Sequence, residues 1–170
     1  MKIKKKIVLI GMMGSGKSSI GLLVSKKLNI NFIDIDNEIE KKLKMKIKNI
    51  FEIKGENYFR KVEEDMTLKV LNNIRNVISL GGGGFLNKQI RKEVLDNHIS
   101  FWLNWKSKTL LKRIKDSKKR PIAIKSSKNE LAKLIKERSI VYSKALYKID
   151  CEGLSKLEIA NYILKIYENN

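Results

Sequence analysis

The chain has 170 residues, of which 42% are hydrophobic and 32% charged, and its formal net charge at pH 7 is +19. This length fits one globular domain with a core of its own, so we expect a single domain over residues 1–170. No apolar run approaches the length of a membrane span, and the lysine-rich start leads into a short strand rather than a signal peptide. These features exclude a membrane protein and favour a cytoplasmic one.

The excess of positive charge comes mainly from lysine, and the lysines are spread over residues 2–165. Nucleic-acid binders typically gather basic residues in one patch, often with aromatic residues between them. The spread pattern instead favours compositional drift, with attraction of anionic ligands as a by-product. We therefore expect no specific nucleic-acid partner.

Three residues with reactive or aromatic side chains are interpreted as packing residues. Cys151 is the single cysteine, so it forms no disulfide within the chain, and its place at the end of an apolar segment favours a core residue over a reactive thiol. Trp102 and Trp105 lie in and just after another apolar segment. We expect these two indoles to pack in the core and at its rim.

A phosphate-binding motif is the strongest functional signal. Residues 11–18 read GMMGSGKS, which fits GxxxxGK[ST], and they follow a strand-like apolar run. The glycines allow the backbone to curl with successive N–H groups pointing inward, and the following helix adds the positive end of its dipole. Lys17 can then reach the β- and γ-phosphates, and the Ser18 hydroxyl can ligate Mg²⁺. A chance match is the alternative, which the flanking strand and amphipathic helix disfavour.

The predicted elements alternate between strands and helices. Strands are expected at 3–10, 32–35, 77–80, 99–103 and 147–151, and helices at 17–28, 36–43, 47–55, 56–71, 88–95, 107–114, 130–145 and 155–167. Alternation of this kind predicts an α/β fold with a parallel sheet covered on both faces. Ligand-binding residues should gather at the carboxyl ends of the strands.

Two further features follow predicted strands. Asp34 and Asp36 are two residues apart, so in an extended segment their side chains would point the same way, one toward the Mg²⁺ hydration shell and the other toward an acceptor. A helix cap is the alternative role for Asp36. The glycine run at 81–84 weakens any regular element, which indicates that another group approaches this backbone closely.

The longest segment without a periodic pattern, 116–129, contains Arg120 followed by proline. We interpret residues 115–128 approximately as a lid that brings the Arg120 cation to the transferred phosphoryl group and excludes water. A solvated basic turn is the alternative. Arg60, on the helix expected at 56–71, would by itself be a solvated charge.

Taken together, the motifs occur in the order and at the spacing of one enzyme family. They are GMMGSGKS at 11–18, DID at 34–36, IF at 50–51, GE at 55–56, FR at 59–60, Glu63, GGG at 81–83, RP at 120–121, and Arg138 with Tyr142. Over nearly its whole length the chain resembles the shikimate kinases. The resemblance implies the P-loop NTPase fold of the nucleoside monophosphate kinases: three α/β/α layers, five parallel strands in the order 2-3-1-4-5, and a lid.

The resemblance also implies an activity, namely transfer of the γ-phosphoryl group of MgATP to the 3-hydroxyl of shikimate in aromatic amino-acid biosynthesis. The implied catalytic residues are Asp36 as base, Lys17 and Arg120, with Ser18 and Asp34 serving Mg²⁺. The implied nucleotide-binding residues are Gly14, Ser15, Gly16, Lys17, Ser18, Ser19, Arg113 against the adenine, and Arg120. The resemblance implies a shikimate-binding region at about 34–63, which contains Asp36, Phe51, Phe59, Arg60 and Glu63. The other implied shikimate-binding residues follow this region and are Gly81, Gly82, Gly83 and Arg138.

The chain departs from the family pattern at three positions. Ser19 replaces the more usual Thr, Ile140 replaces a common Pro between Arg138 and Tyr142, and Gly84 extends the triple glycine. Two kinds of alternative remain: a related kinase for gluconate or a nucleoside monophosphate, and a basic nucleotide-binding regulator that hydrolyses ATP slowly. A monomer is the default for one small domain.

Overall fold

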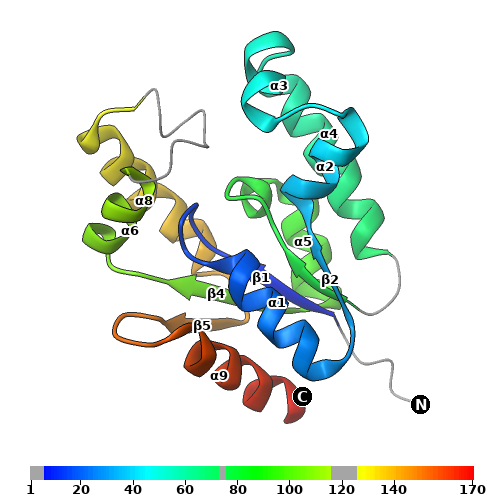
Figure 1. The fold of residues 1–170 in the computed structure, drawn as a ribbon, viewed down its shortest axis with the longest axis vertical. Helices are drawn as coiled ribbons and strands as arrows, with labels where there is room; N and C mark the ends of the chain where they lie inside the picture. The colour runs from blue at the N-terminus through cyan, green and yellow to red at the C-terminus, as the bar shows by residue number, and fades with distance from the viewer. Residues whose placement is uncertain (1–5, 73–75, 116–125) are drawn as a thin grey trace.

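The computed structural model describes residues 6–72, 76–115 and 126–170. Its sheet has five parallel strands in the order β2-β3-β1-β4-β5. This arrangement confirms the predicted α/β class and strand order, and Figure 1 shows β1 at the centre of the sheet. The strands are β1 (Ile7–Ile10), β2 (Asn31–Asp34), β3 (Asn76–Ser79), β4 (Ile99–Asn104) and β5 (Tyr147–Asp150).

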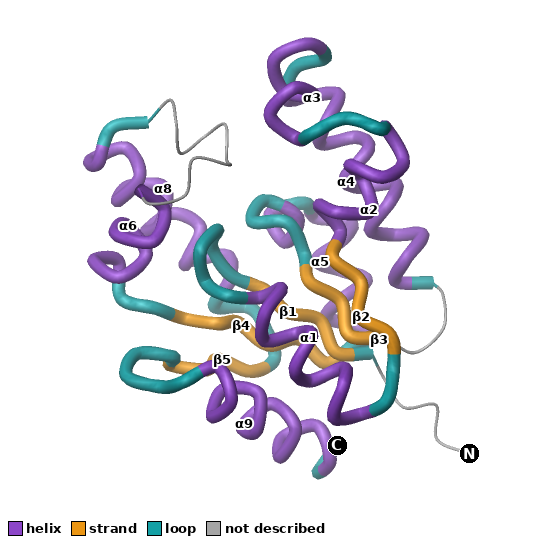
Figure 2. The backbone as a smooth tube through the Cα atoms, viewed as in Figure 1, coloured by secondary structure: helices purple, strands orange, loops and turns teal. Residues whose placement is uncertain are grey.

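The helices form a layer on each face of the sheet (Figures 1 and 2). Helices α1 and α9 pack together on one face, whereas the others cover the opposite face or stand above its carboxyl edge. Their bounds are α1 (Lys17–Leu28), α2 (Ile35–Leu43), α3 (Ile47–Ile53), α4 (Glu56–Leu71), α5 (Lys88–Asn97), α6 (Ser107–Lys115), α8 (Lys128–Tyr142) and α9 (Lys156–Glu168), with a 3-10 turn η1 (Gly84–Leu86).

The central strand explains why its sequence is apolar without alternation. Ile7 and Leu9 point into the core cluster beneath α1 and α9, while Val8 and Ile10 point into the cluster on the other face. All four side chains are at most 1% exposed. Burial on both faces fixes β1, and with it the loop that follows, at the middle of the molecule.

The second strand ends earlier than predicted. Ile35 already belongs to α2, and Asp34 is the residue that caps this helix, accepting a hydrogen bond from the Asn37 amide at 3.3 Å. Asp36 therefore lies in the first helical turn. The predicted extended segment, and Asp36 as helix cap, were both wrong, because the aspartate that precedes the helix satisfies its free amides first.

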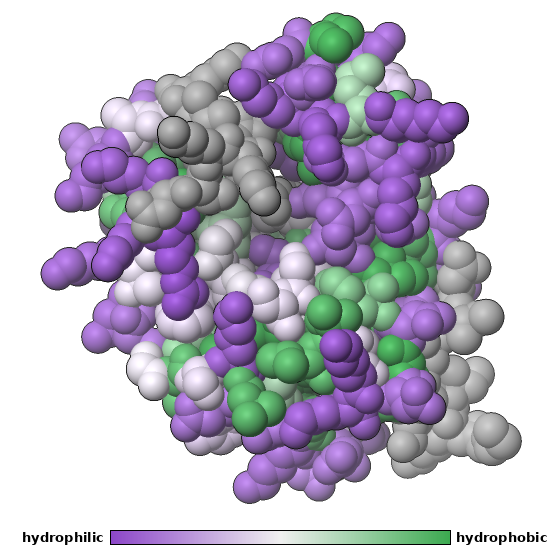
Figure 3. All heavy atoms as spheres, viewed as in Figure 1, coloured by the Kyte–Doolittle hydropathy of each residue, from purple (hydrophilic) through white to green (hydrophobic). Residues whose placement is uncertain are grey.

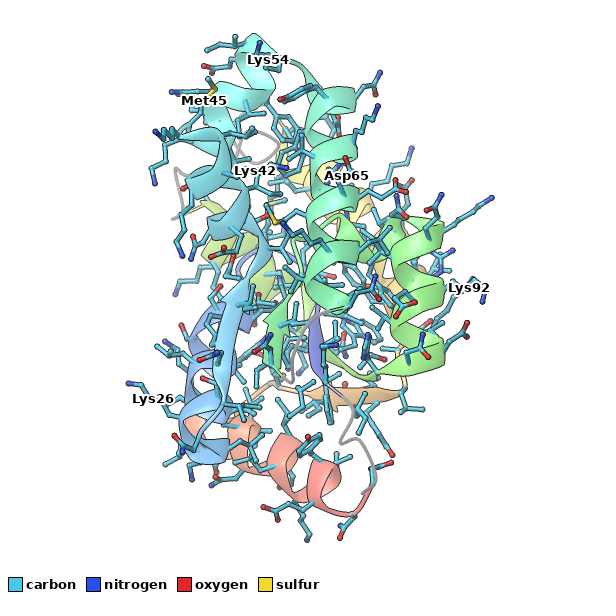
Figure 4. The ribbon with its side chains drawn as sticks, turned by 90° about the vertical axis from the view of Figure 1, so that its right-hand side faces the viewer. Lys26, Lys42, Met45, Lys54, Asp65 and Lys92 are labelled. Atoms are coloured by element: carbon cyan, nitrogen blue, oxygen red, sulfur yellow. The ribbon has the colours of Figure 1, made fainter. Side chains whose placement is uncertain are left out.

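The surface is mostly hydrophilic on the face that Figure 3 displays. Lys26 on α1, Lys54 just after α3 and Lys92 on α5 are exposed and extend outward in Figure 4. The positive charge is thus distributed over separate elements. Within the part of the chain that the structure describes, no helix combines the length and apolar character needed to cross a bilayer.

Cys151 follows β5 and is completely buried, as its interpretation as a core residue requires. Burial, reinforced by the nearby Asp150 carboxylate, raises the pKa of the Cys151 thiol to about 12. At pH 8 a thiol of that pKa is ionised to about one part in 10⁴, and the thiolate is the reactive form.

We expect Cys151 to resist thiol reagents in the native protein. Labelling with an aromatic disulfide reagent at pH 8 should be slower by at least about 100-fold than labelling of the chain unfolded in guanidinium chloride, because both access and ionisation are lost. Equal rates in the two states would contradict the buried, protonated thiol.

Candidate active site

The phosphate-binding loop joins β1 to α1 in a tight curl. Gly14 and Gly16 have φ angles of 78° and 87°, a region that side chains other than glycine rarely occupy. The Ser15 amide donates to the Met12 carbonyl at 3.1 Å and closes the turn, and α1 begins at Lys17. The curl aims the N-terminal end of α1 at the loop, which is the arrangement that binds phosphate.

Two side chains that the motif singles out make hydrogen bonds at the start of α1. The Lys17 ammonium is 6% exposed and donates to the carbonyls of Gly11 at 2.7 Å and Met12 at 3.0 Å, which holds it over the loop. The exposed Ser18 hydroxyl donates to the Asp34 carboxylate at 2.5 Å. Ser19, the next residue, is exposed at the start of α1.

The oxygen atoms of Ser18 and Asp34 fit Mg²⁺ in their chemistry. Mg²⁺ prefers hard oxygen ligands and in phosphoryl-transfer sites is held by one or two protein groups, with substrate phosphates and water completing the shell. No cluster of three or more potential metal-ligating side chains occurs among residues 6–72, 76–115 and 126–170. The oxygen pair of Ser18 and Asp34 beside the phosphate-binding loop would fit the protein's share of such a shell.

A pocket adjoins the phosphate-binding loop, which contributes Met13 to its lining. Its wall is formed by residues of the phosphate loop, α2, α3, α4, the glycine run and α8. Its lining residues are Met13, Asp36, Ile47, Phe51, Phe59, Arg60, Glu63, Gly82, Gly83 and Arg138. Most of these are the residues implied by the resemblance, and they are brought together from segments more than a hundred residues apart.

Arg60 is held in the pocket by two glutamates of its own helix. Its Nη1 donates to Glu63 at 2.7 Å, while Nη2 and Nε donate to Glu56 at 3.0 and 3.2 Å. Its guanidinium also lies 5.2 Å from the centre of the Phe59 ring. Burial would lower the pKa of Arg60, but the two carboxylates outweigh it and raise the pKa, so the side chain is a fixed cation and not a solvated one.

Glu63 is the buried acid of this network and is 3% exposed. Burial raises its pKa, the Arg60 and Arg138 cations oppose that rise, and the neighbouring Asp36 charge adds to it. Asp36 itself is 9% exposed. The pocket thus holds two carboxylates and two guanidinium groups within a small, largely dehydrated space.

Arg138 reaches the pocket from α8 and is 5% exposed. Its Nη1 donates to the Gly82 carbonyl at 3.3 Å, and the Tyr142 hydroxyl donates to the same carbonyl. Its Nε has no hydrogen-bond partner among the described residues. Ile140, in place of the usual Pro, is exposed on α8, so the helix continues unbroken past Arg138.

The glycine run confirms the prediction of a close backbone approach, and the approaching groups are the charged side chains. A Cβ at Gly83 would lie 2.2 Å from Arg60 Nη1, and a Cβ at Gly81 would lie 2.4 Å from Glu63 Oε1. At Gly84 the same atom would meet its neighbours at ordinary contact distance, 3.6 Å. The last glycine of the run, Gly84, begins η1, which the sequence analysis missed.

Two predicted nucleotide-binding residues have different outcomes. Arg113, on α6, lies beside the phosphate loop with Nη1 3.4 Å from the Gly14 carbonyl. Arg120 lies outside the described residues, as does most of the predicted lid. Sequence reasoning missed Met13 and Ile47 in the pocket wall, since an apolar residue inside a loop or on a helix gives no functional signal.

The fold and this site define a class of protein. A phosphate loop at the carboxyl edge of a 2-3-1-4-5 parallel sheet, with an acidic and cationic pocket beside it, is the arrangement of a P-loop kinase with a small-molecule acceptor. The comparisons with known proteins narrow that class.

The shikimate kinase family model matches residues 13–168. The chain is 42% identical to the shikimate kinase of Bacillus subtilis (strain 168), over 95% of this chain and 88% of that protein. It superposes on the shikimate kinase of Acinetobacter baumannii in complex with shikimate with a TM-score of 0.92 at 29% identity, covering 98% of this chain and 94% of the other. The Aquifex aeolicus shikimate kinase gives a TM-score of 0.87 at 38% identity, covering 97% of each chain.

The chain belongs to the shikimate kinase family. It is accordingly an ATP-dependent kinase that phosphorylates a hydroxyl of shikimate.

The contact between Gly83 and Arg60 predicts unequal effects of two neighbouring substitutions. Gly83→Ala should displace the Arg60 guanidinium from its glutamates and raise the KM for shikimate about 10- to 100-fold, the loss expected for hydrogen bonds to a charged group. Gly84→Ala should keep the KM for shikimate within about 2-fold, because the added Cβ would lie at an ordinary van der Waals distance from its neighbours. Steady-state kinetics and thermal unfolding of both variants test this. Equal KM values for the two would refute the role of the Gly83 contact.

Proposed function

We propose that the protein transfers the γ-phosphoryl group of ATP to the 3-hydroxyl of shikimate, giving shikimate 3-phosphate and ADP. The observation that carries this proposal is that the phosphate-binding loop forms part of the wall of the acidic and cationic pocket. Met13, within the phosphate loop, lines the same pocket as Asp36, Arg60 and Arg138. An acceptor in that pocket would lie next to the phosphates held by the loop, as in-line transfer requires.

Arg138 and Arg60 would bind the carboxylate of shikimate. The Nε of Arg138 is buried with no hydrogen-bond partner in the described part of the chain, a costly state that an incoming carboxylate oxygen would relieve. The Arg60 guanidinium is oriented by its hydrogen bonds to Glu56 and Glu63. The planar guanidinium fork suits a carboxylate better than a lysine ammonium would.

Asp36 would bind a ring hydroxyl and serve as the base. As the new oxygen–phosphorus bond forms and the bond between the γ-phosphorus and its bridging oxygen breaks, the hydroxyl proton passes to the Asp36 carboxylate and ADP leaves. Asp36 is the second residue of α2, two positions after the capping residue Asp34, so its position is fixed by the helix start. The buried acid Glu63 and the glycine run beside it would exclude water from the reacting face.

The phosphate loop would supply charge neutralisation rather than covalent chemistry. Its backbone amides at Gly14 and Gly16 would hold the phosphates, with Lys17 beside them as a point charge. Ser15 would shape the loop, because its amide donates to the Met12 carbonyl and closes the turn. Ser18 and Asp34 would hold Mg²⁺, which withdraws electron density from the transferring group.

We further propose that the protein works as a monomer of one domain in the cytoplasm, with residues 34–63 as the shikimate-binding region and about 115–128 as a lid carrying Arg120. Helices cover both faces of the single sheet, which supports one self-contained unit. The use of ATP and the lone buried thiol support a reducing, nucleotide-rich compartment.

A panel of acceptors tests the function. With ATP and Mg²⁺, shikimate should release ADP at a rate at least about 100-fold above that with gluconate or a nucleoside monophosphate, because those acceptors do not combine a carboxylate with a hydroxyl ring of the size that Asp36 and the two arginines enclose. Omission of Mg²⁺ should abolish release. A coupled ADP assay measures all arms, and ATP hydrolysis that no acceptor stimulates would favour the regulator instead.

Asp36→Asn tests the base. This change keeps the shape of the side chain and should lower kcat by about 10² to 10⁴, while the dissociation constant of ADP stays within about 2-fold, because the phosphate loop is untouched. Asp96→Asn is the matched control, since Asp96 is an exposed partner of Lys92 on α5, away from the pocket. Rapid-quench kinetics and calorimetry give both quantities. A normal kcat in Asp36→Asn would remove the residue from the role of base.

A further inference from the structure

Trp105 makes a hydrogen bond that its interpretation as a rim residue does not explain. It follows β4, and its indole Nε1 donates to the carbonyl of Ser15 at 2.9 Å. Ser15 is 0% exposed and sits at the centre of the phosphate-binding curl, ninety positions away in sequence. The indole therefore bonds the carbonyl of the same residue whose amide closes the turn of the phosphate-binding loop.

The same indole also supports a cation. The Arg113 guanidinium lies over the Trp105 ring, 3.8 Å from its centroid, and Arg113 Nη1 donates to the Gly14 carbonyl at 3.4 Å. Such a stack stabilises an exposed guanidinium in one place. Trp105 thus contacts, directly or through Arg113, the carbonyls of two successive residues of the loop.

The indole is well placed to act as a rigid support. It packs against both core clusters, the one beneath α1 and α9 and the one on the opposite face. Around it, α6 packs closely on the loop, since a Cβ at Gly14 would lie 3.4 Å from Arg113 Cβ and 3.6 Å from Ile114 Cγ1. A side chain wedged between two cores loses little further entropy when it makes these contacts.

We propose that Trp105 is a positioning residue for the nucleotide: through Ser15 it fixes the curl of the phosphate loop, and through the stack it fixes Arg113 where a flat base can lie against the guanidinium. The role of Arg113 toward the base rests on the proposed function, whereas the bond to Ser15 stands independently of it. Trp105 is not expected to touch the reacting atoms.

Two variants separate the two contacts. Trp105→Phe keeps a ring beneath Arg113 and removes the N–H donor, whereas Trp105→Leu removes both. Tyr147→Phe is the control, because it also removes one aromatic hydrogen-bond donor, from a bond to Asn170 at the far end of β5. Each protein is titrated by calorimetry with ADP and with inorganic pyrophosphate in the presence of Mg²⁺, and its thermal unfolding is recorded.

Trp105→Phe should weaken ADP and pyrophosphate alike, by about 2- to 10-fold, because the lost bond acts on the phosphate cradle that both ligands share. Trp105→Leu should weaken ADP by about a further 2- to 5-fold with no further loss for pyrophosphate, because the unsupported guanidinium affects the ligand that has a base. In kinetics, both variants should raise the KM for ATP and leave kcat and the KM for shikimate within about 2-fold. Tyr147→Phe should bind as the unaltered protein does.

Several results would overturn the proposal. Trp105 would be a packing residue only if both variants unfolded at a lower temperature but bound ADP and pyrophosphate with dissociation constants within 2-fold of those of the unaltered protein. Should Trp105→Leu fail to fold, the phenylalanine variant decides, since it retains the ring and its packing. Failure of the unaltered protein to phosphorylate shikimate would refute the proposed acceptor, yet the ADP and pyrophosphate titrations would still decide the role of Trp105.

Discussion

The site depends on one constraint, which is that the backbone amides between β1 and α1 stay open to an anion. Gly14 and Gly16 adopt φ values that place those amides on the inside of the curl, and the curl keeps that shape because its other side is occupied. Lys17 is bonded to the carbonyls at the start of the loop, and Trp105 to the carbonyl at its middle. The loop is thus preorganised by contacts to its carbonyls and by the bond from the Ser15 amide to the Met12 carbonyl. A loop that is already in shape loses little free energy to reorganisation when an anion binds.

A second constraint links the phosphate loop to the pocket. The Gly82 carbonyl accepts hydrogen bonds from both Arg138 and Tyr142, and the Arg138 side chain also contacts the sulfur of Met12 at 3.9 Å. One residue of α8 therefore touches the glycine run and the phosphate loop together. Movement of α8, which follows the segment predicted as a lid, would shift both walls of the pocket at once.

Local rules were sufficient to predict the phosphate loop and the alternation of strands and helices, because both depend on short patterns in the chain. The strand order and most of the pocket residues were implied by the resemblance to the shikimate kinases, whose motifs have a fixed spacing. Glycine positions and the Lys17–Ser18 pair are read directly from the chain. The relation between Asp34 and Asp36 was not predictable in the same way, since it depends on which of two aspartates caps α2. Trp105 was taken as packing because a contact across ninety positions leaves no periodic trace.

The arrangement of charge in the pocket explains why an anionic acceptor suits it better than a neutral one. Arg60 already has two carboxylate partners, and burial together with Asp36 acts against the ionised form of Glu63. Arg138 is 5% exposed. Its Nη1 contacts the Gly82 carbonyl and the Met12 sulfur, whereas its Nε has no hydrogen-bond partner within the described residues. A buried guanidinium with an unmet N–H donor is costly, so an acceptor carboxylate gains more there than it would at a solvated arginine. A neutral analogue of the same shape would leave that cost in place, and the pocket would discriminate against it by the unmet hydrogen bond rather than by its volume.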